Sequence, residues 1–153
     1  MQTIVKVLTA TRTMTLNEVK ELTPEQWFEI PAGFHNNIAW NVGHLIFATD
    51  GLIYKRGGLA GHVGADYAQR YANGTSPSDW DSQPDIEELM AQLVAQPAQL
   101  AADVEAGMFE GDYPTWSLGP VPINSFMEIG VYNAQHEGWH RGVMESIRGA
   151  LSN

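Results

Sequence analysis

The chain has 153 residues, of which 44% are hydrophobic and 17% are charged, and this is enough to enclose the apolar core of a single domain over residues 1–153. It contains no cysteine, which excludes disulfides, zinc ribbons, iron–sulfur clusters and catalysis by a protein thiol. There are 8 Lys and Arg against 18 Asp and Glu, a formal charge of −10, so neither nucleic acid nor an anionic membrane is an expected partner.

The first residues have neither the pattern of a signal peptide nor that of a membrane span. Residues 1–16 are interrupted by Lys6, by Arg12 and by several threonines. We therefore expect a cytoplasmic protein.

Two long helices are predicted in the first part of the chain. Residues 3–22 place apolar side chains and threonines at helical spacing. Residues 23–26 (Thr-Pro-Glu-Gln) have the form of a capping box and predict a short helical turn. Asn36 and Asn37 are suitable N-caps for a second long helix, which is expected to end about Arg56, where two glycines follow.

Two irregular stretches separate the remaining helices. Residues 57–83 are rich in Gly, Asp, Asn, Ser and Pro, and such a long connection is typical of a functional segment or of a crossover along a bundle. Pro84 is expected to open the third helix, which Pro97 should kink. After residues 107–121, Pro122 is expected to start the fourth helix. This pattern predicts an all-α four-helix bundle with a long crossover between its second and third helices, which then run parallel.

Histidines carry the strongest functional signal in the sequence. His136 and His140 lie four residues apart in the last predicted helix, so both rings project from one face, within reach of a single ion. Three neutral imidazoles around a divalent ion leave a coordination position open, which is typical of catalytic sites. His44, mid-helix beside an apolar stripe, is the best candidate for the third ligand, and His35 and His62 remain alternatives or additional ligands.

Two other interpretations compete with this metal site. A histidine on an apolar face is usually hydrogen-bonded within a core, so the three rings could serve structure alone. Residues 136–140 also match H-E-x-x-H, the zinc-protease signature in which Glu137 would be the general base. The extended protease motif fails, because Val143 and Ser146 occupy its glycine and histidine positions, and a protease is therefore not favoured.

The segment Asn37-Ile-Ala-Trp-Asn-Val-Gly-His-Leu45, followed about ninety residues later by His136-x-x-x-His140, resembles the DinB/YfiT-like superfamily of metal-dependent proteins over essentially the whole chain. The resemblance implies a four-helix bundle of up-down-down-up order with His44, His136 and His140 as ligands of nickel, zinc or a similar divalent ion such as iron or manganese. It also implies a homodimer. Some relatives use low-molecular-weight thiols, such as bacillithiol or mycothiol, as cosubstrates.

These observations together predict a metal-dependent enzyme acting on a small molecule, either a hydrolase or a transferase of low-molecular-weight thiols. Candidate residues beside the metal or in its pocket are Trp40, Asn41, Asn133 and Glu137, but no catalytic base can be assigned. The alternative is a helical bundle that binds a metal or a small ligand without catalysis. A fourth protein ligand that closed the site would favour that alternative.

Overall fold

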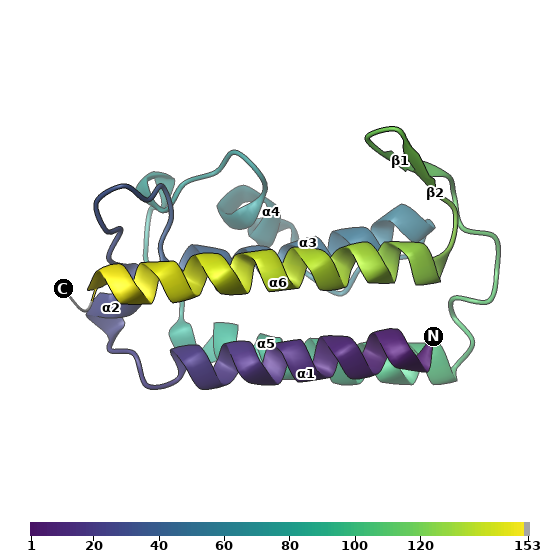
Figure 1. Cartoon of the computed structure of the whole chain (residues 1–153), viewed down its shortest axis with the longest axis horizontal. Coiled ribbons are helices and arrows are strands. Elements are labelled where there is room, and N and C mark those ends of the chain that lie inside the picture. Colours follow the sequence, from purple (N-terminus) through teal and green to yellow (C-terminus); the bar gives the residue numbers. More distant parts are fainter. Residues whose placement is uncertain (152–153) are drawn as a thin grey trace.

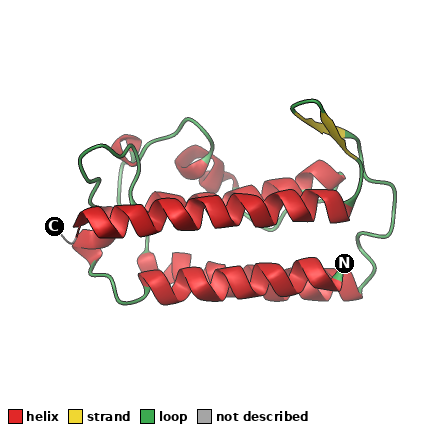
Figure 2. Cartoon of the chain, in the orientation of Figure 1, coloured by secondary structure: helices red, strands yellow, loops and turns green. Residues whose placement is uncertain are grey.

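The computed structural model describes residues 1–151, which are mostly helical (Figure 2). Four long helices run along the longest axis of the molecule (Figure 1): α1 (Gln2–Val19), α3 (Ile38–Ile53), α5 (Ile86–Glu105) and α6 (Phe126–Leu151). Helices α1 and α3 each pack against both α5 and α6. The prediction of an all-α chain is thus confirmed in its broad form. Within residues 1–151, no helix combines the length and the apolar character needed to cross a lipid bilayer.

Shorter elements connect the long helices: α2 (Pro24–Phe28), the 3₁₀ turn η1 (Lys55–Gly57), α4 (Ala65–Tyr71), the 3₁₀ turn η2 (Pro77–Asp79), and the strands β1 (Trp116–Leu118) and β2 (Val121–Ile123). The capping box is confirmed, because the Gln26 N–H donates to Thr23 Oγ1 and the Thr23 N–H donates to Gln26 Oε1. The stretch predicted as irregular, residues 57–83, therefore contains a short helix and a 3₁₀ turn.

The predicted helix ends need small corrections. The first helix ends at Val19 rather than at residue 22. Asn37 caps the second helix, because its side chain accepts a hydrogen bond from the Trp40 N–H. This helix ends at Ile53 rather than Arg56, because the chain tightens into the 3₁₀ turn η1, which Gly58 closes with a left-handed φ of 75°.

The third helix begins two residues after the proline that was expected to open it. Asp85 is the N-cap of α5, and its carboxylate accepts hydrogen bonds from the backbone N–H groups of Glu87 and Glu88. The helix continues through Pro97, which is buried within it.

The prediction that Pro122 starts the fourth helix is wrong, since α6 begins at Phe126. Pro122 lies in β2, opposite Ser117 of β1, in a two-stranded antiparallel hairpin. A proline is tolerated there because each strand of a two-stranded ribbon has an unpaired edge. Gly119, with a φ of 58°, occupies the first position of the short turn between the strands, as hairpin turns require.

Buried side chains form two apolar clusters, one toward each end of the helices. One cluster includes Val19, Trp27, Leu45, Leu93 and Met144, and the other includes Leu8, Ile53, Leu100, Phe126 and Ile129. Between them, each long helix contributes buried polar side chains: Arg12 from α1, Thr49 from α3, Gln96 from α5, and Asn133 and Glu137 from α6. We call these five residues the polar layer.

Arg12 is the centre of the polar layer. Its Nε lies 3.0 and 2.8 Å from the two carboxylate oxygens of Glu137, and its Nη2 lies 2.6 Å from Glu137 Oε1. Nη2 also lies 2.9 Å from the Leu45 carbonyl oxygen and 3.0 Å from both Thr49 Oγ1 and Gln96 Oε1. The guanidinium group therefore contacts all three of the other long helices.

Replacing Arg12 should destabilise the fold strongly. Arg12→Ala leaves the Glu137 carboxylate buried without its counter-charge, which costs about 3–5 kcal/mol of unfolding free energy. Urea denaturation followed by circular dichroism measures this loss. The double variant Arg12→Met, Glu137→Met should lose less stability than Arg12→Ala, because no charge is left unpaired.

Arg141 provides a matched control. It donates from Nε to Glu18 at 2.8 Å, but both side chains are partly exposed. Arg141→Ala should therefore cost only about 0–1 kcal/mol. Equal losses for Arg12→Ala and Arg141→Ala would contradict the importance given to the polar layer.

Candidate metal centre

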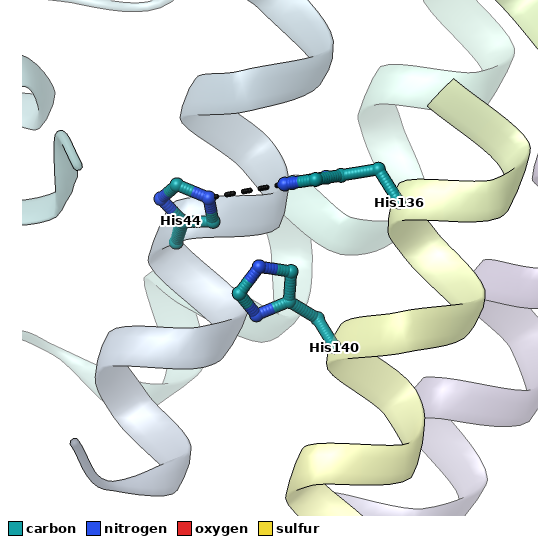
Figure 3. Close-up of side chains that lie close together, drawn as sticks. All are labelled: His44, His136 and His140. Carbon is teal, nitrogen blue, oxygen red and sulfur yellow. Dashed lines mark hydrogen bonds between the residues drawn. The ribbon is translucent and has the colours of Figure 1, made fainter. Parts of the chain in front are cut away.

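The structure brings together the three histidines that the sequence singled out. His44 projects from α3, and His136 and His140 project from α6, so that the three rings face one another across the two helices (Figure 3). One ring nitrogen of each residue lies within 4.8 Å of the other two. Within residues 1–151, no other His, Asp or Glu joins this group, so the exposed His35 and the loop residue His62 lie outside it.

Hydrogen bonds orient two of the three rings. His44 Nδ1 lies 2.7 Å from the carbonyl oxygen of Tyr71, which can only accept, so Nδ1 carries the proton. His140 Nδ1 lies 2.8 Å from Asn41 Oδ1, and the Asn41 amide nitrogen in turn donates to the Asn37 carbonyl. Both rings therefore present an unprotonated Nε2, which is the form that binds a metal.

His136 supplies the observation that tests whether a cation fits. Its Nε2 lies 3.3 Å from His44 Nε2, and its Nδ1 is buried with no hydrogen-bond partner among the described groups. His44 Nε2 has no proton to donate. The short distance between the two nitrogens is therefore explained either by a hydrogen bond from His136 Nε2–H to His44 Nε2 or by a cation between them. Three neutral imidazoles are a donor set that suits zinc or nickel, so the residues present fit a divalent ion.

Burial keeps these histidines uncharged at neutral pH. It lowers the pKa of His136 to about 4, with smaller contributions from His44 and Arg12, and that of His140 to about 3, with smaller contributions from His44 and His136. Burial also lowers the pKa of His44, although its hydrogen bond to the Tyr71 carbonyl acts in the opposite direction. All three rings thus have the protonation state that metal ligands need.

Packing around His44 depends on a glycine whose role sequence reasoning missed. A Cβ at Gly43 would overlap the ring of Tyr71, so only glycine lets α4 approach α3 closely enough for the Tyr71 carbonyl to reach His44. On the other side, the Trp40 indole stacks on the His44 ring with centroids 4.7 Å apart and an interplanar angle of 9°. A glycine inside an otherwise apolar helix was the available signal for this close approach.

The histidines form part of the wall of a cavity of about 810 Å³. Aromatic side chains line much of it, namely Trp40, Phe47, Trp116, Tyr132 and Trp139. Of the four residues predicted near the metal, Trp40 and Asn41 line this cavity and contact the histidines. Asn133 and Glu137 do not line it, because their side chains belong to the polar layer.

Acidification should destabilise the metal-free protein. Unfolded histidines titrate near a pKa of 6.5, whereas folded His136 and His140 take up protons only at about pH 4 and about pH 3. At a pH between the folded and unfolded pKa values, the unfolded state binds more protons than the folded state. The free energy of unfolding therefore falls as the pH drops from about 7 toward 4. Urea denaturation in the presence of a chelator, repeated across this range, measures the slope.

Two variants separate this effect from general acid sensitivity. Replacing both His136 and His140 by Gln should flatten the slope, while His35→Gln, at an exposed position, should leave it unchanged. Identical slopes in all three proteins would rule out the buried histidines as its cause.

Comparison with known proteins identifies the family of the chain. The sequence profile of the DinB superfamily matches residues 8–144, a range that includes all three histidines and the whole polar layer. No curated protein sequence matches the chain. On the strength of a profile match over most of its length, the chain belongs to the DinB superfamily.

Proposed function

We propose that the protein is a divalent-metal-dependent enzyme that acts on a small molecule, with His44, His136 and His140 holding the ion. One observation carries this proposal: the three histidines lie in the wall of a large cavity, and no fourth His, Asp or Glu within residues 1–151 closes the group. Structural metal sites usually have four protein ligands, whereas three leave a position open to a substrate.

Nickel and zinc suit three imidazole ligands best, and iron or manganese are the alternatives. A divalent ion in such a site activates a water molecule for hydrolysis or a thiol for transfer. In the second case the thiol would be a low-molecular-weight cosubstrate, because the chain has no cysteine of its own. The residues of the chain would bind the substrate along the aromatic wall and keep the imidazoles oriented through Tyr71 and Asn41.

The position of Glu137 argues against the zinc-protease mechanism. In H-E-x-x-H proteases the glutamate is a general base facing the metal-bound substrate. Here Glu137 is fully buried, and both its carboxylate oxygens accept hydrogen bonds from Arg12. It therefore supports the fold rather than the chemistry.

We also propose that the long helices form an up-down-down-up bundle. The course of the chain in Figure 1 supports this order, since α1 and α6 run toward the left of the view while α3 and α5 run toward the right. The homodimer implied by the resemblance stays a prediction, which the molar mass in solution tests.

Metal analysis tests the proposed site directly. Protein purified without an affinity tag should contain about one equivalent of a divalent metal, since the described part of the chain holds one group of three histidines that could bind an ion. His44→Ala, His136→Ala and His140→Ala should each lose it, because two remaining ligands hold an ion weakly. His35→Ala and His62→Ala are the controls and should retain full metal content. A wild-type protein that takes up no metal even after incubation with nickel or zinc would reject the proposal.

Asn41→Ala should weaken metal binding without removing a ligand. The loss of the acceptor for His140 Nδ1–H frees the ring to rotate, and comparable losses at other metal sites lower affinity about 10–100-fold. Competition with a fluorescent chelator measures the affinity. Asn73→Ala is a suitable control, because Asn73 lines the same cavity. An affinity unchanged in Asn41→Ala would show that this hydrogen bond does not orient the ligand.

A further inference from the structure

The charge of the cavity is opposite to that of the rest of the protein. The chain carries 18 Asp and Glu, yet among the described residues that line the cavity there is no carboxylate. Lys55 and Arg56, two of only 8 Lys and Arg in the chain, both line it. A basic cavity in an acidic protein favours a negatively charged ligand electrostatically.

Arg56 has the geometry of an anion-binding group. Its guanidinium carbon lies 4.2 Å from the centroid of the Trp116 ring, so the aromatic face holds the side chain in place. Within residues 1–151 no carboxylate forms an ion pair with it. A guanidinium group bonds through the N–H groups at its edge, and those groups suit the paired oxygens of a carboxylate or phosphate.

Lys55 contributes less charge to the cavity. Its Nζ lies 3.2 Å from Asp50 Oδ2, and the Asp50 side chain is fully buried beneath it. The same ammonium group lies 6.0 Å from the centroid of the Phe47 ring. Lys55 is thus paired with a carboxylate, whereas Arg56 has no ion-pair partner among the residues that the structure describes.

An apolar wall connects Arg56 with the histidines. Ring contacts run from Trp116 to Tyr132, with centroids 5.6 Å apart, and from Tyr132 to His136, at 6.3 Å. On the α3 side, Phe47, Ala48, Gly51 and Leu52 line the cavity between His44 and Lys55. A continuous row of aromatic and apolar side chains therefore lies between the cation and the histidines.

We propose that this cavity binds an elongated small-molecule anion. Its carboxylate or phosphate group bonds to Arg56, its apolar body lies along Trp116 and Tyr132, and its opposite end reaches the three histidines. The inference rests on the proposed function and defines the class of substrate for that site. The overall charge of −10 opposes the binding of any anion, so the local contact with Arg56 has to supply the preference.

Three probes with the same apolar body test the preference: phenylbutyrate, phenylbutyl phosphate and the uncharged phenylbutanol. Calorimetry should show that wild-type protein binds at least one anion more tightly than the alcohol. In Arg56→Met that anion should bind about tenfold more weakly, the loss expected for a charge-assisted hydrogen bond, while the alcohol binds as before. The tighter of the two anions identifies the group, carboxylate or phosphate, that Arg56 accepts.

Two controls keep the result specific to Arg56. Lys6→Met removes the same charge from an exposed position on α1 and should leave all three affinities unchanged. Arg56→Lys keeps the charge and should retain part of the preference for the anion. Thermal unfolding of each variant verifies that it is folded, which is expected because Arg56 is exposed.

Each measurement is made on both metal-free and metal-loaded protein, because a divalent ion itself attracts anions. Loss of the anion preference in Arg56→Met under both conditions, with metal content unchanged, supports the inference. Equal binding of alcohol and anions by the wild type, or equal affinities in Arg56→Met and Lys6→Met, overturns it.

If wild-type protein holds its metal yet shows no anion preference, the inference fails while the proposed function stands. If the anion preference depends on Arg56 but no metal binds, the proposed function fails alone.

Discussion

A charge enclosed by helices has to be both neutralised and hydrogen-bonded. In this protein Nε and Nη2 of Arg12 reach their partners only when all four long helices are in place, while Nη1 is buried without a hydrogen-bond partner among the described groups. Its guanidinium group contacts a carboxylate on α6, a carbonyl and a hydroxyl on α3, and an amide oxygen on α5. The apolar clusters on either side would tolerate small shifts of one helix along another, because apolar contacts have little directionality. Hydrogen bonds to a buried charge do not tolerate such shifts. The polar layer therefore fixes the relative positions of the helices along the axis of the molecule.

The geometry of the three-histidine group depends on this layer. Glu137 and His136 are neighbours on α6, and successive residues point about 100° apart around a helix. Anchoring Glu137 to Arg12 therefore sets the rotation of α6, and with it the direction of His136 and of His140 one turn later. On α3, the Leu45 carbonyl that contacts Arg12 directly follows His44 in the chain. Residues that do not line the cavity thus hold the three histidines in position, as a preorganised site requires.

The sequence was sufficient to predict that three histidines lie together, because His136 and His140 share a helix and a spacing of four, and because His44 sits beside an apolar stripe. The sequence was not sufficient to predict the central role of Arg12. A single charged residue in an apolar row only interrupts the pattern until its partners on other helices are known. The sequence offered Asn133 and Glu137 as candidates beside the metal, but helical spacing could not show that their side chains meet Thr49 and Arg12 instead. Pro122 was misassigned because proline suits both the first turn of a helix and an edge strand, and three-residue strands are too short to show a period. The contact of His44 with Tyr71 involves a backbone carbonyl, which has no signature in the sequence.

That carbonyl belongs to the connection between α3 and α5, so the docking of this connection would be coupled to the binding of any ion by His44. The Tyr71 carbonyl at the end of α4 orients His44 only while α4 is docked against Gly43. The same hydrogen bond from the His44 imidazole helps to hold α4 in place. By thermodynamic reciprocity, an ion that bound more tightly with α4 docked would stabilise the docked state of α4 by the same free energy. Slow amide hydrogen exchange in α4 would therefore report the occupancy of a site to which α4 contributes no ligand.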